Sequence, residues 1–133
     1  WPHGGEIDIM EYYNHSILAN VAWAGPHGKP KWDNARIPME RFNDPAWDQK
    51  FHLWVMVWTP RRIDLYLDGA LLNSTLLKDT VNRDGPARSP FVDAPQFLRL
   101  NLAIGGTNGG DPAETNFPQR YEIDYVRVYQ RQH

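Results

Sequence analysis

Short apolar runs alternate with turn-forming residues along this 133-residue chain. The runs are rich in valine, isoleucine, leucine and aromatic residues, and eleven prolines and ten glycines interrupt any helical period. This pattern is typical of an all-β sandwich. It predicts strands at residues 6–13, 17–24, 51–59, 62–67, 70–77, 96–104 and 121–130.

Turn residues divide the predicted strands. Asp68 and Gly69 form the Asp-Gly pair of a two-residue hairpin. The strand at 51–59 is apolar on both faces, so we expect it to be central in its sheet. Residues 25–49 and 78–95 are expected to be long loops, with a helical turn within 38–43. Long loops in a compact β domain are often functional.

The predicted strand at 6–13 carries three carboxylates within six residues, at Glu6, Asp8 and Glu11. Acidic residues are depleted from strands, so this crowding has a cost. Chemistry that needs carboxyl groups of different pKa is the commonest reason to bear it. In a regular strand Glu11 would point away from the face of the other two acids. A β-bulge at Ile9 or Met10 would return it to that face.

With that bulge, the two glutamates could approach the ~5–5.5 Å separation that a retaining glycosidase needs. Asp8 would lie between them, close enough to hydrogen-bond either one. The alternative is a surface strand whose acids are solvated.

Composition limits the partners of the chain. One domain is expected from 133 residues. The net charge is −2 and there is no basic tract, so we expect neither a nucleic-acid partner nor an anionic membrane surface. No apolar run approaches the ~18 residues of a spanning helix. The absence of cysteine excludes disulfides and thiolate chemistry. Six Trp and six Tyr suit both sandwich cores and sugar-binding clefts.

The stretch Gly-Glu-Ile-Asp-Ile-Met-Glu at residues 5–11 resembles the signature of glycoside hydrolase family 16. Its longer Glu-x-Asp-x-x-Glu form is similar to the bulged branch of laminarinases, agarases and carrageenases. Other segments agree in order and spacing, namely Phe51-His52, Trp58-Thr59-Pro60, Leu67-Asp68-Gly69, residues 100–106 and residues 121–129.

This resemblance implies a concanavalin-like β-jelly-roll of two antiparallel sheets, with a sugar cleft across the concave sheet. Residues 1–133 would form a single catalytic domain that lacks its N-terminal strands, because family members are usually longer. A second chain or self-association would then complete the sandwich, or the chain would be an unusually compact version of the fold. The resemblance also implies a secreted or extracellular protein.

The resemblance assigns roles to the acids. Glu6 would be the nucleophile, Glu11 the general acid and then the general base, and Asp8 the residue that orients Glu6. The anomeric configuration would be retained and no cofactor would be required.

Further positions are weaker candidates. Trp1 and Trp23 resemble cleft aromatics, although packing in the sandwich is the alternative for both. Asn101 is a candidate for a hydrogen bond to a sugar. Asp124 matches a position that helps to bind a structural calcium ion in many relatives. The loop histidines lack metal-ligand spacing; they are His3, His15 and His27.

We therefore expect an endo-acting β-glycan hydrolase, with β-1,3-glucan as its substrate. A galactan of the agarose, carrageenan or porphyran type is the alternative substrate. The sequence is also compatible with a non-catalytic glycan-binding β-sandwich and with an inactive fragment.

Overall fold

The computed structural model describes residues 1–131. Its contacts group the chain into two compact units, Trp1–Leu98 and the segment from Arg99 onward. The first unit contains six described strands: β1 (Glu6–Tyr13), β2 (Ser16–Ala24), β3 (Pro30–Pro38), β4 (Trp54–Trp58), β5 (Arg62–Leu67) and β6 (Ala70–Leu76).

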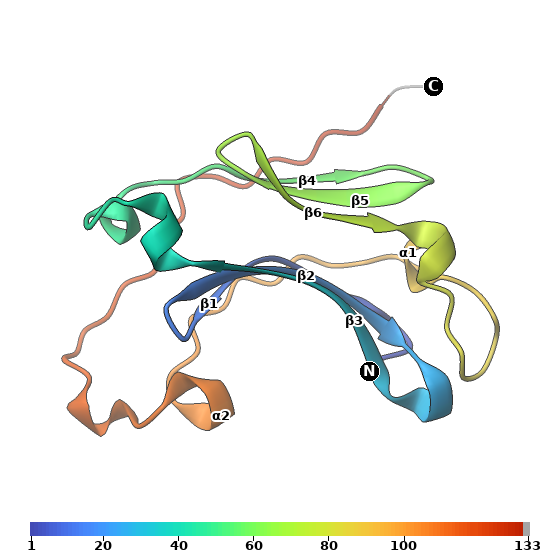
Figure 1. Ribbon diagram of the computed structural model, residues 1–133, viewed down its shortest axis with the longest axis horizontal. Coiled ribbons are helices and arrows are strands. Elements are labelled where there is room, and N and C mark those ends of the chain that lie inside the picture. The colour runs from blue at the N-terminus through green and yellow to red at the C-terminus, as the bar shows by residue number, and fades with distance from the viewer. Residues whose placement is uncertain (132–133) are drawn as a thin grey trace. The chain divides into compact units, whose positions relative to one another are not determined.

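The six strands form two antiparallel three-stranded sheets, ordered β1-β2-β3 and β4-β5-β6. Figure 1 shows the sheets as two stacked layers in the first unit. Single helical turns lie in the connections between strands and after β6, at Pro26–Gly28, Met39–Phe42, Trp47–Gln49, Leu77–Asp79 and α1 (Pro90–Asp93).

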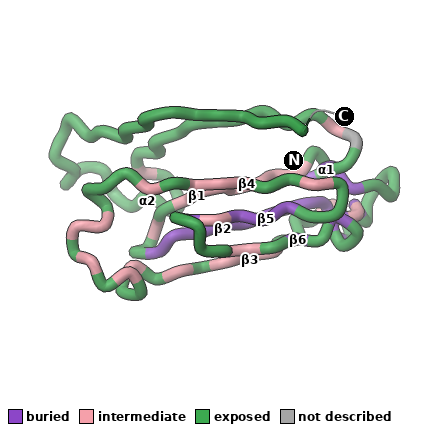
Figure 2. Tube along the Cα trace, turned by 90° about the horizontal axis from the view of Figure 1, so that it is seen from above, coloured by how far each residue is buried: buried purple, intermediate pink, exposed green. Residues whose placement is uncertain are grey.

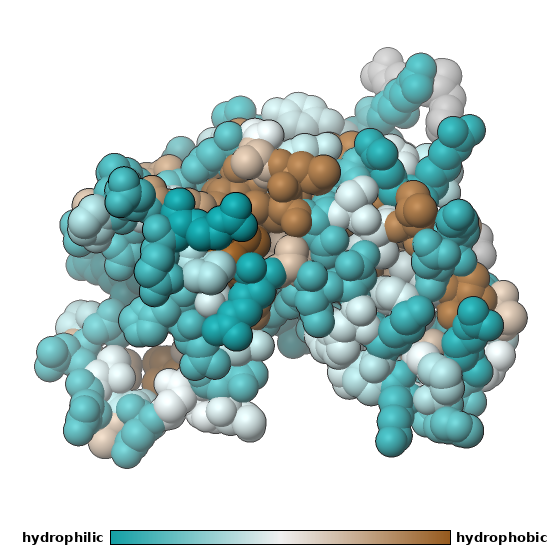
Figure 3. Space-filling view, in the orientation of Figure 1, coloured by the Kyte–Doolittle hydropathy of each residue, from teal (hydrophilic) through white to brown (hydrophobic). Residues whose placement is uncertain are grey.

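The core lies between the facing sides of β2 and β5, the central strand of each sheet. Both strands are the most buried of their layer in Figure 2. Side chains alternate along a strand, so every second residue of β2 enters the core. The core cluster consists of Ala19, Val21, Trp23, Ile63, Leu65, Leu77 and Phe91, each at most 3% exposed. Figure 3 shows apolar side chains that reach the surface where β3 and β6 border this core.

The structure confirms the all-β sandwich and five of the seven predicted strands. The Asp-Gly hairpin turn is also confirmed, since Asp68 and Gly69 have φ values of 48° and 82°. Positive φ at both central residues is the mark of a type I′ turn. The predicted helical turn is present at Met39–Phe42.

Three expectations are wrong. Residues 25–49 are not one loop, because Pro30–Pro38 forms β3 against β2. The strand β4 is an edge strand, because β5 lies between it and β6. Residues 96–104 and 121–130 contain no described strand, since no ladder of backbone hydrogen bonds forms there.

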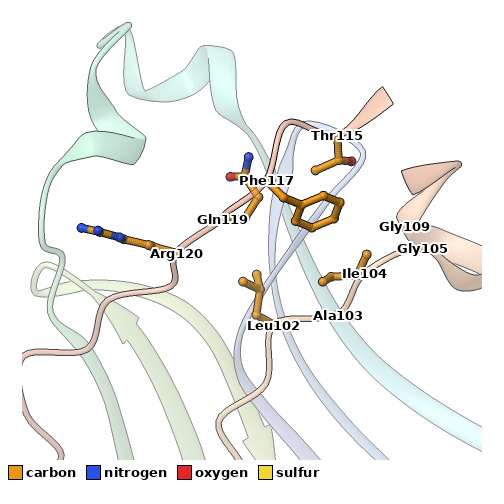
Figure 4. Close-up of a pocket in the computed structure, with 9 residues that line it drawn as sticks. All are labelled: Leu102, Ala103, Ile104, Gly105, Gly109, Thr115, Phe117, Gln119 and Arg120. Atoms are coloured by element: carbon orange, nitrogen blue, oxygen red, sulfur yellow. The ribbon is translucent and has the colours of Figure 1, made fainter. Parts of the chain in front are cut away.

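The second unit, from Arg99 onward, contains α2 (Gly106–Gly109) and a 3₁₀ turn at Pro112–Glu114. Two extended segments of this unit border a pocket of about 240 Å³ (Figure 4). Leu102, Ile104 and Phe117 are among its lining residues, and none of the lining residues is an acid or a histidine. The pocket therefore offers no side chain for acid–base chemistry. Among the described residues, no helix is long and apolar enough to span a membrane. The single domain expected from the length stays a prediction.

Gly5 fixes the entry of the chain into β1. Its φ is +73°, and a Cβ atom there would lie 2.6 Å from the ring of Phe91 and 2.9 Å from Pro90. Phe91 is 1% exposed and part of the core, so its ring has little room to move. Only glycine therefore combines this backbone conformation with this close approach.

We expect Gly5→Ala to lower the free energy of unfolding by about 2 kcal/mol or more, because overpacking and a strained φ add together. Urea unfolding followed by circular dichroism measures this change. Gly4→Ala is the matched control, since no atom lies within 4 Å of the Cβ position at Gly4. Equal stability of the two variants would contradict the packing described here.

Candidate active site

The predicted bulge in β1 is present. Asp8 pairs with Asn20 and Glu11 pairs with Leu18, so two residues of β1 oppose the single residue Ala19 of β2. The pairing changes phase between Asp8 and Glu11. This is the two-against-one count of a β-bulge.

The bulge brings all three acids to the face of the sheet that points away from the core. Their cross-strand partners are Ala22, Asn20 and Leu18, alternate residues of β2. The intervening residues of β2 enter the core, and directly opposed residues share a face. Ile7 and Ile9 of β1 pack against the core on the other side. Three carboxyl groups are thus collected on one half-buried strand.

Burial and mutual repulsion perturb these carboxyl groups. Burial raises the pKa of Asp8 to about 8, with further contributions from the negative charges of Glu11 and Glu6 and from a hydrogen bond with Glu6. Burial also raises the pKa of Glu11, and the charge of Glu6 raises it further. At neutral pH Asp8 therefore keeps its proton and can donate it in a hydrogen bond to Glu6.

Asn20 is a site residue that sequence reasoning missed. It is 6% exposed, lies directly opposite Asp8, and its Nδ2 donates to Oε2 of Glu11 over 3.2 Å. This amide lowers the pKa of both acids, against the larger effects of burial and charge. The signal was present in the sequence, because Asn20 is a polar residue within an otherwise apolar strand.

Two buried oxygens of this cluster, Asp8 Oδ2 and Asn20 Oδ1, accept no hydrogen bond from the described residues. An ionised carboxylate can only accept, whereas a protonated one also donates. Burying an oxygen without a partner costs less for a neutral carboxyl group than for a carboxylate, which agrees with the raised pKa of Asp8.

The same face continues onto β3 through Trp32, Asn34 and Arg36, all exposed. Cross-strand pairing places Trp32 beside Ala22 and therefore in the row of Glu6. The indole rings of Trp32 and Trp1 lie 6.0 Å apart at an angle of 48°. Trp1, a predicted cleft aromatic, is 68% exposed. The sequence did not predict Trp32 as a site residue because residues 25–49 are rich in loop signals, although polarity alternates along residues 34–37.

One predicted cleft residue of the first unit, Trp23, does not join this cluster. Trp23 is 3% exposed and belongs to the core, so it cannot line a cleft. Ala19, Val21 and Trp23 are every second residue of β2, so their side chains all point to the core side of the sheet. Asn101 and Asp124 belong to the second unit and are exposed, and their roles stay predictions.

The calcium site at Asp124 stays a prediction. The described residues include no group of three or more acidic, histidine or cysteine side chains placed to hold a metal ion. Calcium needs six to eight oxygen ligands, and a single exposed carboxylate at Asp124 does not supply them. We derive no step through a metal.

The family model described as glycosyl hydrolases family 16 matches residues 2–127. The chain belongs to this family. The predicted family and its two-sheet sandwich are therefore confirmed.

Three known proteins are similar to this chain over 84% or more of its length. Beta-glucanase of Rhodothermus marinus is 31% identical over 97% of this chain and 46% of that protein. Glucan endo-1,3-beta-glucosidase of Cryptopygus antarcticus is 30% identical over 97% of this chain and 50% of that protein. Beta-1,3-glucan-binding protein of Penaeus monodon is 29% identical over 84% of this chain and 36% of that protein.

The crystal structure of LamAcat from Zobellia galactanivorans superimposes with a TM-score of 0.63 at 26% identity. The match covers 86% of this chain and 42% of that one. This family 16 chain thus spans half or less of the length of these relatives.

The Asn20 amide gives a direct test of the site geometry. In Asn20→Ala the pKa of Glu11 should rise, because a hydrogen bond to its ionised form is lost. A hydrogen bond to a charged group contributes ~1.5–3 kcal/mol, which corresponds to about one pH unit or more. Carboxyl-carbon NMR titration measures this change.

Asn34→Ala is the matched control for that titration, since Asn34 lies one strand further from the acids on the same face. It should leave the Glu11 titration unchanged. An unchanged pKa in Asn20→Ala would show that the amide does not hold Glu11.

Proposed function

We propose that this chain contributes the catalytic centre of an endo-acting β-glycan hydrolase that retains the anomeric configuration and cleaves β-1,3-glucan. The observation that carries the proposal is the bulge, which collects Glu6, Asp8 and Glu11 on one sheet face. Binding alone does not need three carboxyl groups in one half-buried cluster.

In this mechanism Glu6 attacks the anomeric carbon and Glu11 protonates the oxygen of the leaving sugar. The glycosyl–enzyme ester on Glu6 is then cleaved by a water molecule that Glu11 deprotonates. The raised pKa of Glu11 supports its role as the acid, because a proton must be present at the start. Burial is the largest cause of that rise, and the charge of Glu6 adds to it, so the nucleophile helps the acid to hold its proton.

Asp8 has the supporting role. Its proton, held by the raised pKa, can be donated to Glu6 and so fixes the orientation of the nucleophile. The neutral state of Asp8 also limits the negative charge of the cluster. A third ionised carboxylate would make both of the others harder to use.

β-1,3-Glucan is favoured by the names of two relatives, an endo-1,3-beta-glucosidase and a beta-1,3-glucan-binding protein. Arg36, the cation on the same strand face, donates to Ser16 Oγ over 3.0 Å and to the carbonyl of Asn14 over 3.4 Å. It is thus already engaged, which favours a neutral glucan over a sulfated galactan. Such a hydrolase would meet its polymer outside the cell.

Glycan binding without hydrolysis is the second candidate function. It is favoured by the relative whose name describes binding alone, the beta-1,3-glucan-binding protein. The two functions differ in what happens when the acids are changed. A binding module would keep its affinity for glucan and release no reducing ends.

The test is reducing-end release from laminarin by the wild type and by Glu6→Gln and Glu11→Gln. We expect release by the wild type, with loss of ~10²–10⁴-fold in Glu11→Gln, because general acid catalysis contributes that factor. Glu6→Gln should be at background. Glu40→Gln, an exposed glutamate outside the site, is the matched control and should keep full activity. Hydrolysis that survives Glu6→Gln would contradict the proposal.

Azide separates the two glutamate roles in the alanine variants. Glu6→Ala with azide should give the glycosyl azide of inverted configuration, because azide replaces the nucleophile in a single displacement. Glu11→Ala should give the retained product, because azide attacks the intermediate. The opposite pair of products would show that Glu11 is the nucleophile and Glu6 the general acid.

A further inference from the structure

Trp32 occupies an unusual place for a large apolar residue. It lies on the edge strand β3, on the face opposite to the core, and is 37% exposed. Its sequence neighbour Asp33 points the other way and accepts a hydrogen bond from Thr75 of β6 over 2.8 Å. The orientation of β3 is therefore fixed by its inner face, and Trp32 has to point outward.

The residue that lies between Glu6 and Trp32 on this sheet face is small. Cross-strand pairing gives one row of Glu6, Ala22 and Trp32 across the three strands. Ala22 is buried and small, so its own side chain does not separate the carboxylate from the indole. Two strand spacings separate them, about 10 Å.

Trp1 faces the same place. Its ring centroid lies 6.0 Å from that of Trp32 at a tilt of 48°, so the rings are neither stacked nor perpendicular. Both indoles keep exposed surface, 68% for Trp1 and 37% for Trp32. Exposed aromatic rings beside a polar cluster commonly mark a binding surface.

The chemistry of the pair identifies its ligand. A flat indole presents an apolar face and a polar N–H edge, which complements the C–H face and the hydroxyl rim of a pyranose. Asn34, next on this face of β3, adds an exposed amide that can hydrogen-bond hydroxyl groups. A neutral sugar ring satisfies all three side chains, whereas a phosphate or a sulfate would find no free cation on this strand face, where Arg36 is engaged.

We propose that Trp32, together with Trp1, is a platform that binds a neutral sugar ring of the glycan beyond the ring being cleaved, on the β3 side of Glu6. This assignment rests on the proposed hydrolysis of β-1,3-glucan by the same sheet face. Trp32 touches no reacting atom, so its contribution is to hold a long chain in register with the acids.

The experiment compares Trp32→Ala with the wild type on laminarin and on a short β-1,3-glucan oligosaccharide. For laminarin we expect KM to rise about tenfold with little change in kcat, because binding remote from the bond is lost. For an oligosaccharide too short to reach β3, neither constant should change. Trp32→Phe should restore most of the affinity, because it keeps an aromatic face.

Trp58→Ala is the matched control, because Trp58 is 38% exposed but lies in the other sheet. It should leave KM for laminarin unchanged. Equal KM values for Trp32→Ala and the wild type would overturn the platform while leaving the hydrolase in place.

Affinity electrophoresis in laminarin gels, in a Glu6→Gln background, measures glucan binding by the platform in the absence of hydrolysis. Trp32→Ala should lose the retardation that Glu6→Gln alone shows, and unchanged retardation would contradict the platform. A wild-type protein that is retarded but releases no reducing ends would overturn the proposed hydrolysis and not the platform.

Discussion

One extra residue in β1 is the constraint on which the site depends. Two residues of β1 face the single residue Ala19 of β2, and this count shifts the phase of the strand between Asp8 and Glu11. Without it, Glu11 would point toward the core, where an unpaired carboxylate costs several kcal/mol. With it, Ile7 and Ile9 still pack on the core while all three acids leave it. Core packing and the acid cluster are thus compatible only through the bulge.

Collecting the acids changes their chemistry. Burial and repulsion together favour states that hold a proton, and the effect is largest at Asp8. Between the ordinary pKa of an aspartate and about pH 8, the folded chain binds a proton at Asp8 that the unfolded chain has lost. The free energy of unfolding therefore decreases as pH rises through this range. Asn20 opposes the rise at both Asp8 and Glu11, so its amide moderates a cluster that would otherwise be harder to ionise.

Local sequence patterns predicted the features that depend on neighbouring residues, such as side-chain alternation along a strand and the residues of a tight turn. The bulge followed from three acids that had to share a face, and the hairpin turn followed from Asp68-Gly69. The strand β3 was missed because Gly and Pro at its start read as loop signals. Trp32 was missed with it, and Asn20 could be assigned only once the register with β1 was known. The failed strand predictions at 96–104 and 121–130 have another cause, because a strand requires a partner as well as a suitable sequence.

Burial of Asp8, together with the charges of Glu11 and Glu6 that the bulge brings to the same face, keeps the Asp8 carboxyl group protonated at neutral pH. Carboxyl-carbon NMR of the folded protein, with Asp8 assigned by comparison with Asp8→Asn, measures this most directly. The account predicts that Asp8 titrates near pH 8, far above its usual range. An Asp8 carboxyl that titrates near pH 4 would contradict it, because the three acids would then be solvated and independent.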